Sequence, residues 1–353
     1  MRKPHDEPTA VATIVPFGRE TRQAYFNFAA SYTPLNHGSF GAFPLCVREY
    51  QRRLQRETEA RPDTFIRFTY PKLLREAREV VAPLLGADTD EVVFVPNALT
   101  AVNTVLRNLT YQDGDVILYF GTIYDACLKT IESLEETTKV KGHSIELLYP
   151  VEDDEILDRF RAAITEIQNQ GRSVKLAMFD TILTFPGVRF PWERLVPICK
   201  EYGILSCIDG AHGIGHIDLR HLPRVGPDFF ISGSWYPAGA RYSEGYEPVA
   251  QRETQSQNNY FVNLFEKVST IDTTPYICVI EASKFRDQIC GGEERVRNYC
   301  ISMAKEGGEL MAAMLGTDVL ENKTGTLRDC SFTNVRLPLE VTDDAGEERH
   351  TVE

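Results

Sequence analysis

From about residue 71 onward, stretches with the apolar spacing of a helix alternate with short apolar runs of the kind that form buried strands. This alternation is typical of a parallel sheet whose two faces are covered by helices. We therefore expect an α/β fold with a mainly parallel sheet flanked by helices. The predicted strands are residues 91–95, 115–120, 144–149, 175–180, 204–209 and 228–232, with a later one at 331–339.

The ends of several predicted helices are marked by residues that favour helix termini. Gly86 follows an apolar stripe and can adopt the left-handed conformation common at helix C-termini. Pro191 suits the first turn of a helix, where its missing N–H leaves no bond unmade. The predicted helices are residues 71–86, 99–109, 123–136, 156–171, 191–202 and 281–315.

The chain has 353 residues, of which 42% are hydrophobic and 10% aromatic, so it can bury a core larger than that of one average domain. We expect residues 1–30 to form an N-terminal arm and residues 31–280 to form one large domain. Residues 281–353 would then form an incomplete small C-terminal domain that ends in a charged tail.

Net charge, apolar run lengths and cysteine spacing exclude several classes of partner. A formal charge of -13 argues against nucleic acids, because binding their phosphates needs clustered Lys and Arg. No apolar run approaches the ~20 residues that span a bilayer. The eight cysteines form no C-x-x-C pair, which indicates reduced thiols rather than a metal site or disulfides. We expect a cytoplasmic protein that acts on a small molecule and binds no nucleic acid, membrane or metal.

Asp209 is the strongest single candidate for chemistry. It ends an apolar strand and is followed by Gly210, which places its carboxylate at the edge where open α/β sheets bind ligands. One interpretation is an Asx turn capped by glycines. The other is an anion that pairs with a protonated ring nitrogen, as in a cofactor that accepts electrons from a substrate carbanion.

Other residues lie where a ligand could reach them, and each also has a structural interpretation. The turn at 97–100 could present backbone N–H groups to a phosphate, or could be an ordinary helix cap. Tyr124 could stack on a flat ring or pack in the core. Asn36 and His37, in a glycine-bearing turn, could reach a substrate or could have structural partners.

Several common enzyme signatures are missing from the sequence. It contains no G-x-G-x-x-G after an early strand and no G-x-x-x-x-G-K-[ST]. It also contains no H-E-x-x-H and no G-x-S-x-G. Dinucleotide binding, P-loop chemistry, zinc proteolysis and α/β-hydrolase chemistry are therefore not indicated.

A series of ordered motifs resembles the class V aminotransferase superfamily, which comprises fold-type I enzymes that use pyridoxal 5'-phosphate. Within that superfamily the chain is most similar to fungal isopenicillin-N-epimerase-like proteins and to the hercynylcysteine sulfoxide lyases of ergothioneine biosynthesis. The resemblance covers nearly the whole chain after residue 30. The motifs are NHGSFG at 36–41, EARPDTFIR at 59–67, VFVPNALTAVNTVLRN at 93–108, TIYDACLKTI at 122–131, PGVRFPWE at 186–193, IDGAHGIG at 208–215, FVNLFEKVSTIDTTPY at 261–276 and CGGEERV at 290–296.

The resemblance implies how the cofactor would be held by the large domain of a fold-type I enzyme. Asp209 would pair with the pyridine nitrogen, and Tyr124 would stack on the ring. Thr184 and His212 would lie near the ring hydroxyl. The residues around the phosphate would be Ala98, Leu99 in place of the usual Thr, Thr100 and Ser232.

The resemblance also implies a homodimer with shared sites. Ser269 and Thr270 match a pair of residues that contact the phosphate from the neighbouring subunit in such enzymes. Each site of the dimer would then contain residues of both chains.

The chain departs from the family pattern after Ser232. Relatives carry Ser-Asn-(x)-His-Lys-Trp at this point, whereas this chain reads Ser232, Gly233, Ser234 and Trp235. The lysine that relatives join to the cofactor as a Schiff base is therefore absent, and Lys267 lies too far along the chain to replace it. The part of the C-terminal domain that carries a substrate-binding Arg in relatives is also absent.

Three hypotheses about function follow from the motifs and the missing lysine. The first is an enzyme lineage that cleaves the C–S bond of a cysteine-derived sulfoxide by β-elimination. The second is a non-catalytic protein that binds pyridoxal phosphate or serves as a dimer partner, which the absent lysine favours. The third is an epimerase of amino acids, similar to isopenicillin-N epimerases.

Overall fold

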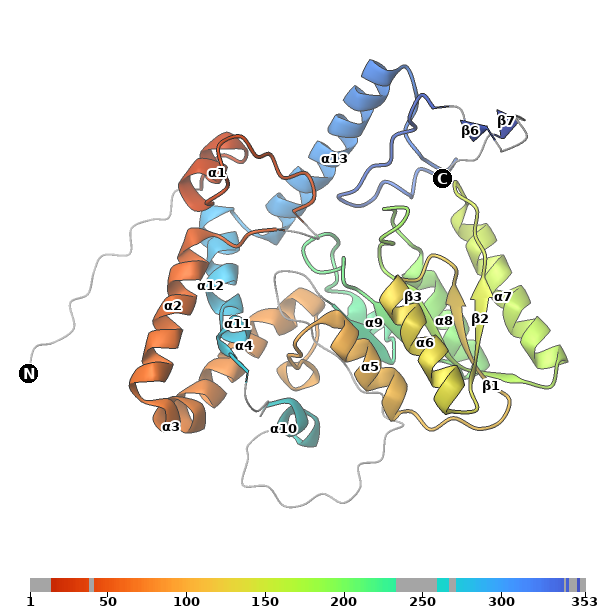
Figure 1. Ribbon diagram of the computed structural model, residues 1–353, viewed down its shortest axis with the longest axis horizontal. Helices are drawn as coiled ribbons and strands as arrows, with labels where there is room; N and C mark the ends of the chain where they lie inside the picture. Colours follow the sequence, from red (N-terminus) through yellow and green to blue (C-terminus); the bar gives the residue numbers. More distant parts are fainter. Residues whose placement is uncertain are drawn as a thin grey trace, which may run out of the picture.

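The computed structural model describes residues 14–37, 41–232, 259–266, 271–339, 341–342 and 348–349. Within these residues the centre of the fold is a parallel sheet with the strand order β2-β1-β3-β4-β5 (Figure 1). The expected α/β fold with a mainly parallel sheet is confirmed. The strands are β1 (Asp115–Phe120), β2 (Lys141–Ile145), β3 (Ser173–Asp180), β4 (Leu205–Asp209) and β5 (Phe229–Ile231).

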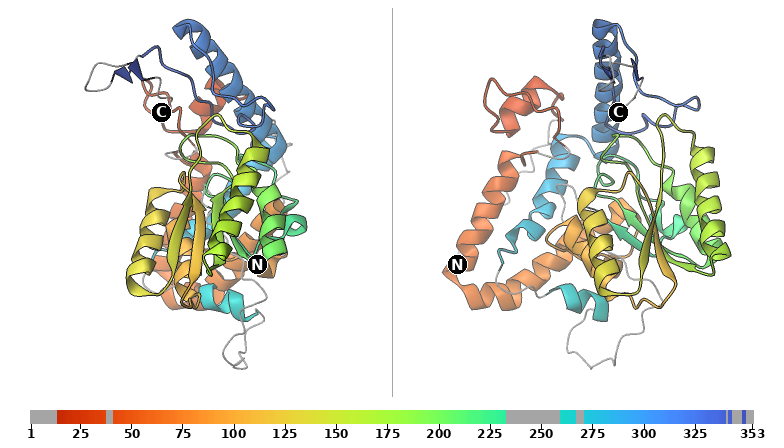
Figure 2. Two further views of the ribbon diagram at one scale, coloured as in Figure 1. Left: turned by 90° about the vertical axis from the view of Figure 1, so that its right-hand side faces the viewer. Right: turned by 45° about the vertical axis from the view of Figure 1, so that its right-hand side comes forward.

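Helices cover both faces of the sheet, as Figure 2 shows in its edge-on view. Helices α5 (Ala98–Asn108) and α6 (Asp125–Thr137) pack on one face, in a cluster that includes Met178 of β3. Helices α7 (Asp153–Asn169) and α8 (Trp192–Tyr202) pack on the other face, in a cluster that includes Phe179. Neighbouring residues of a strand point to opposite faces, so the apolar runs of the sequence are buried on both sides.

A second group of helices packs beside the sheet and extends the larger apolar cluster. Within this group α4 (Tyr70–Leu85) contacts α12 (Val279–Lys284), and α2 (Leu45–Ala60) contacts α11 (Thr274–Ile277). No helix in the described part of the chain is long and apolar enough to cross a membrane. The remaining elements are α1 (Arg19–Tyr25), α2 (Leu45–Ala60), α3 (Pro62–Thr64), the π-helical turn η1 (Phe65–Thr69), α4 (Tyr70–Leu85), the 3-10 turn η2 (Thr89–Glu91), α9 (Leu222–Val225), α10 (Tyr260–Glu266), α11 (Thr274–Ile277), α12 (Val279–Lys284), the π-helical turn η3 (Phe285–Ile289), α13 (Glu293–Leu315), β6 (Val341–Thr342) and β7 (Glu348–Arg349).

Two predicted strands are wrong, and a third is shifted along the chain. Residues 92–95 are buried but belong to no strand of the described chain, because they pack against the core without joining the sheet. The run 331–339 contributes only an isolated bridge between Val319 and Val335. The strand expected at 144–149 is β2, which begins at Lys141 and ends at Ile145, and Leu148 beyond it is 76% exposed.

The helix expected to run through 281–315 is interrupted. Its first part is α12 and η3, and the long helix α13 begins only at Glu293. Gly291 and Gly292 separate the two parts with φ angles of 80° and 96°, a left-handed backbone that a continuous helix cannot contain. The N-terminal residues pack on this junction, where Val15 N donates a hydrogen bond to Ile289 O at 3.1 Å.

The glycine at the C-terminal end of α4 allows a test of how closely that end packs against its neighbour in the fold. Gly86 and Gly203 both end helices with left-handed φ angles, 64° and 68° respectively. A Cβ on Gly203 would meet no atom within 4 Å, whereas one on Gly86 would collide with the carbonyl oxygen of Arg220. We expect Gly203→Ala to lower the free energy of unfolding by about 1 to 2 kcal/mol, and Gly86→Ala to lower it by more. Equal losses in urea denaturation would show that the contact with Arg220 does not limit the turn.

Candidate functional site

The carboxyl ends of β3 and β4 bring two acidic residues together. Asp180 and Asp209 are paired in the parallel ladder, each as the last residue of its strand. In each strand, the side chain two residues before the Asp packs under α5 and α6. Side chains alternate between the two faces of a strand, so both carboxylates point to that same face. Asp180 is 7% exposed and Asp209 is 5% exposed. The edge of the sheet therefore carries a pair of buried carboxylates.

Each oxygen of Asp209 has a hydrogen-bond donor. The backbone N–H of Ala211 donates to Oδ1 at 2.9 Å, and the thiol of Cys127 donates to Oδ2 at 3.7 Å. Cys127 lies in the first turn of α6, where its own N–H donates to Tyr124 O at 2.8 Å. One helical turn thus joins Tyr124 to Asp209 at the same edge of the sheet. The side chain of Tyr124 is half exposed, which leaves a ring face free to stack.

The two carboxylates differ in how their charge is stabilised. Burial raises the pKa of Asp180 well above its usual value, and the neighbouring Asp209 raises it further. Burial also raises the pKa of Asp209, but the hydrogen bonds from Ala211 and Cys127 oppose that shift. Among the described residues no Lys, Arg or His forms an ion pair with either carboxylate. A buried anion without a cation is a suitable partner for a positively charged ring nitrogen.

The N-terminus of α5 is capped by the side chain of Asn97. Asn97 Oδ1 accepts hydrogen bonds from Thr100 N at 2.8 Å and from Thr100 Oγ1 at 3.0 Å. The structural interpretation of this turn is therefore correct. Within the described chain the N–H groups of Ala98 and Leu99 have no acceptor, as is usual for the first residues of a helix. Those two groups and the helix dipole can still bind an anion.

Ser232 directly follows β5 and is held against the strand that carries Asp209. Its hydroxyl donates to Gly210 O at 2.7 Å, and Gly210 N donates to Ile231 O at 2.5 Å. Ser232 is almost completely buried. Its oxygen keeps lone pairs for a further contact, while its proton is already used by Gly210.

Thr184 and His212 lie on the loops that follow β3 and β4. The ring of His212 contacts the ring of Phe332 edge-on, with centroids 5.2 Å apart, and lies 5.8 Å from the ring of His216. Burial lowers the pKa of His212, and burial together with His212 and Arg286 lowers the pKa of His216 to about 4. Both rings are therefore neutral at neutral pH and act as hydrogen-bonding groups rather than as cations.

The C-terminal segment formed by residues 322–334 fixes these two loops. Phe332 packs on the backbone of Gly187, three residues after Thr184, and on the ring of His212. Asn334 Nδ2 donates to Gly187 O at 3.0 Å. The segment therefore connects the loop of Thr184 with the turn of His212.

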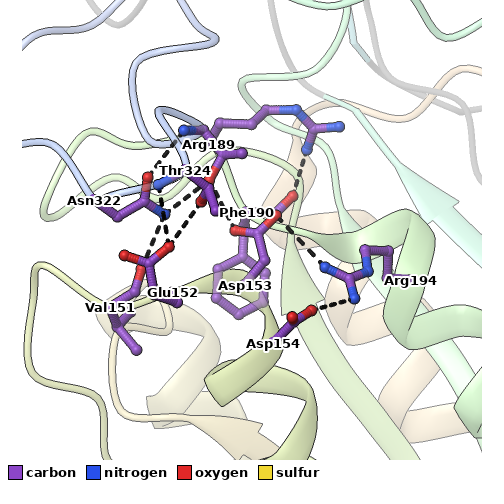
Figure 3. A network of polar contacts seen from close by, with 10 residues as sticks. Val151, Glu152, Asp153, Asp154, Arg189, Phe190, Arg194, Asn322 and Thr324 are labelled. Carbon is purple, nitrogen blue, oxygen red and sulfur yellow. Dashed lines mark hydrogen bonds and ion pairs between the residues drawn. The ribbon is translucent and has the colours of Figure 1, made fainter.

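Figure 3 shows how the same segment is anchored at the start of α7. Asn322 Nδ2 donates to Val151 O at 3.1 Å. Glu152 accepts from Lys323 N at 2.6 Å and from Thr324 Oγ1 at 2.8 Å. These bonds join residues 171 or more positions apart in the sequence, so they tie the C-terminal segment to the start of α7.

The remaining sequence candidates lie in the N-terminal segment or outside the described residues. The ring of His37 packs edge-on against Phe26 and Phe28, with centroids 5.6 and 5.9 Å apart, and burial lowers its pKa. These contacts belong to the N-terminal segment, as does the exposed residue Asn36. The segments that contain Gly233 to Trp235, and Ser269 with Thr270, lie outside the described residues.

Sequence reasoning missed Asp180 and Cys127. The signal for Asp180 is that KLAMFD and ILSCID both end in Asp, so parallel pairing of the two strands brings the carboxylates together. The signal for Cys127 is weaker, because its spacing of three residues from Tyr124 only places it in the same turn of helix.

Comparisons with known proteins agree with this geometry. The family model described as Aminotransferase class-V matches residues 65–239. The L-cysteine desulfhydrase-like protein lolT1 of Epichloe uncinata is 33% identical over 367 residues, which cover 93% of this chain and 80% of that protein. The hercynylcysteine sulfoxide lyase of Schizosaccharomyces pombe is 28% identical over 345 residues, covering 92% and 84%.

Among solved structures, the cysteine desulfurase CsdA of Escherichia coli superimposes with a TM-score of 0.67 at 15% identity. The match covers 92% of this chain and 84% of that one. At this identity the likeness shows the fold. The alignment with lolT1 is longer than the 353 residues of this chain, so lolT1 carries residues in the aligned part that have no counterpart here.

The buried carboxylate pair makes a prediction about stability and pH. The pKa of Asp180 is raised in the folded protein, so its contribution is most favourable below about pH 4 and is lost as pH rises through the folded pKa. We expect Asp180→Asn to be more stable relative to the native chain at pH 7.5 than at pH 5. Urea denaturation at the two pH values measures this difference. The control Asp113→Asn, at an exposed position, should show no such difference in stability between the two pH values. A pH-independent effect of Asp180→Asn would contradict the prediction.

Proposed function

The chain belongs to the class-V aminotransferase family, and we propose that it binds pyridoxal 5'-phosphate, the cofactor of this family, at the sheet edge that carries Asp209. The observation that carries this proposal is a buried carboxylate with both oxygens held by donors and, among the described residues, no cation beside it. A protonated pyridine nitrogen would supply the missing positive charge. The pairing would in turn keep that nitrogen protonated.

The neighbouring groups fit the other parts of the cofactor. We assign the ring of Tyr124 to one face of the pyridine, because it starts the helix whose first turn contacts Asp209. The free N–H groups of Ala98 and Leu99 at the start of α5 suit the phosphate, together with Thr100 and Ser232. Thr184 and the neutral ring of His212 suit the ring hydroxyl, because both can exchange hydrogen bonds with it.

We assign the chain to the cysteine C–S lyase lineage, since relatives that it resembles are named cysteine desulfhydrase and hercynylcysteine sulfoxide lyase. When bound, pyridoxal phosphate withdraws electrons from the α-carbon of an amino acid, so that a sulfur substituent on the β-carbon can leave. Asp209 supports this chemistry by holding the proton on the ring nitrogen. The substrate class that we propose is a small cysteine-derived molecule. The alternative function is epimerisation of an amino acid.

The sequence at 232–235 separates this chain from a complete enzyme of that lineage. It reads Ser-Gly-Ser-Trp and offers no amine for a Schiff base with the cofactor. We therefore propose that the cofactor is held by noncovalent contacts alone, and that no lysine removes the α-proton of a substrate. A positioned acid or base contributes typically 10²- to 10⁴-fold to a rate, so C–S cleavage should be slower than in the relatives by at least that factor.

Binding of pyridoxal phosphate tests the proposal directly. We expect the purified chain to bind the cofactor reversibly, with loss on dialysis, and Asp209→Asn to weaken binding by roughly tenfold or more because a charged hydrogen bond is lost. Fluorescence titration measures the affinity, and Asp113→Asn serves as the exposed control. Borohydride treatment followed by peptide mapping should yield no pyridoxyl-lysine. Absence of binding, or a reduced lysine adduct, would contradict the proposal.

We also propose that the chain forms a homodimer with shared sites, in which the segment containing Ser269 and Thr270 reaches the partner's phosphate. A cytosolic location suits the free cysteines of the chain. Light scattering at micromolar concentration should give twice the mass of 39.9 kDa. Ser269→Ala combined with Thr270→Ala should weaken cofactor binding without changing that mass. A monomer in the native chain would rule out the shared site.

A further inference from the structure

The paired carboxylates at the ends of β3 and β4 raise the question of which one carries the charge. Two buried carboxylates side by side do not both ionise readily, because each disfavours the charge of the other. Asp180 and Asp209 occupy equivalent positions in their strands and are buried to a similar extent. Position in the sheet alone therefore does not decide between them.

The hydrogen-bond donors around the pair are unequally distributed. Asp209 receives the N–H of Ala211 at one oxygen and the thiol of Cys127 at the other. Within the part of the chain that the structure describes, the carboxylate of Asp180 receives no donor, and burial and the charge of Asp209 both raise its pKa. Donors favour the charged form of a carboxylate, so the asymmetry favours charge on Asp209.

We infer that Cys127 is a positioning residue, whose thiol holds the negative charge on Asp209 and leaves the shared proton on Asp180. This inference deepens the proposed function, because only an ionised Asp209 can pair with a pyridinium nitrogen. In this role Cys127 acts through Asp209. The same helical turn carries Tyr124, so this turn positions both the ring that would stack on the cofactor and the thiol that donates to Asp209.

The groups that face the pair are consistent with Cys127 as a donor. Burial raises the pKa of the Cys127 thiol, and the negative charge of Asp209 raises it further, so the S–H proton stays in place. Cys207 of β4 also interacts with Asp209 through space but makes no hydrogen bond to it. Tyr149, in the loop after β2, interacts with Asp180, and burial raises the pKa of its hydroxyl. None of these three groups is charged at neutral pH.

The first experiment uses the protein without added cofactor, so that it is independent of the proposed function. Aspartate labelled with 13C at Cγ is incorporated, and the signals of Asp180 and Asp209 are identified from the Asn variants. We expect the Asp209 signal to titrate at lower pH than that of Asp180. In Cys127→Ala the Asp209 titration should move to higher pH, whereas Cys207→Ala, which removes a buried thiol two residues before Asp209, should leave it unchanged. No movement in Cys127→Ala, or an equal movement in Cys207→Ala, would overturn the inference.

The second experiment measures affinity for pyridoxal phosphate. Cys127→Ala should weaken binding about twofold to tenfold, the range expected for one hydrogen bond. Adding Asp180→Asn should restore the affinity, because Asp209 then has no neighbouring carboxylate to oppose its charge. Failure of Asp180→Asn to restore binding would contradict the inference. If the native chain binds no cofactor, the proposed function fails, while the carboxylate titrations still decide the role of Cys127.

Discussion

Parallel pairing of β3 with β4 places Asp180 beside Asp209 at the edge of the sheet, and the chemistry of the site depends on that pairing. The two strands enter the core as apolar runs and end in carboxylates. Burying those carboxylates is unfavourable unless hydrogen bonds or a cation stabilise them. Among the described residues, helix α6 and the turn after β4 provide two donors to Asp209 and none to Asp180, so the site distinguishes two acids that the ladder makes equivalent.

The site is assembled from segments that are distant in the sequence. Helices α5 and α6 provide the free N–H groups and the ring of Tyr124, while the strands provide the carboxylates. The C-terminal segment, through Phe332 and Asn334, holds the loop of Thr184 next to the turn of His212. Because this segment is anchored at Glu152 and Val151, changes at the start of α7 can alter the position of groups at the site.

Much of the fold follows from local patterns. The buried strands β1, β3, β4 and β5 were recognisable because apolar runs of strand length alternate with helical stripes, and Gly86 marked a real helix end. The runs at 91–95 and 331–339 have similar composition but find no partner strand in the described sheet. Composition cannot distinguish an extended segment that joins a sheet from one that only packs against it.

The residues of the candidate site also differ in how far the local sequence reveals them. Asp209 was recognisable from its place at a strand end, which is a local property. Asp180 required knowledge that β3 and β4 are neighbours, and Cys127 required the packing of α6 on their face. The role of Phe332 depends on contacts across more than a hundred residues, which no spacing in the sequence reveals.

The central claim is that Asp209 pairs with a protonated ring nitrogen without help from a lysine. The most direct measurement is the 15N chemical shift of pyridoxal phosphate labelled at the pyridine nitrogen and bound to the native chain. The account predicts the shift of a protonated pyridinium in the native chain and that of a neutral pyridine in Asp209→Asn at the same pH. A neutral nitrogen in the native complex, or the same shift in both proteins, would contradict it.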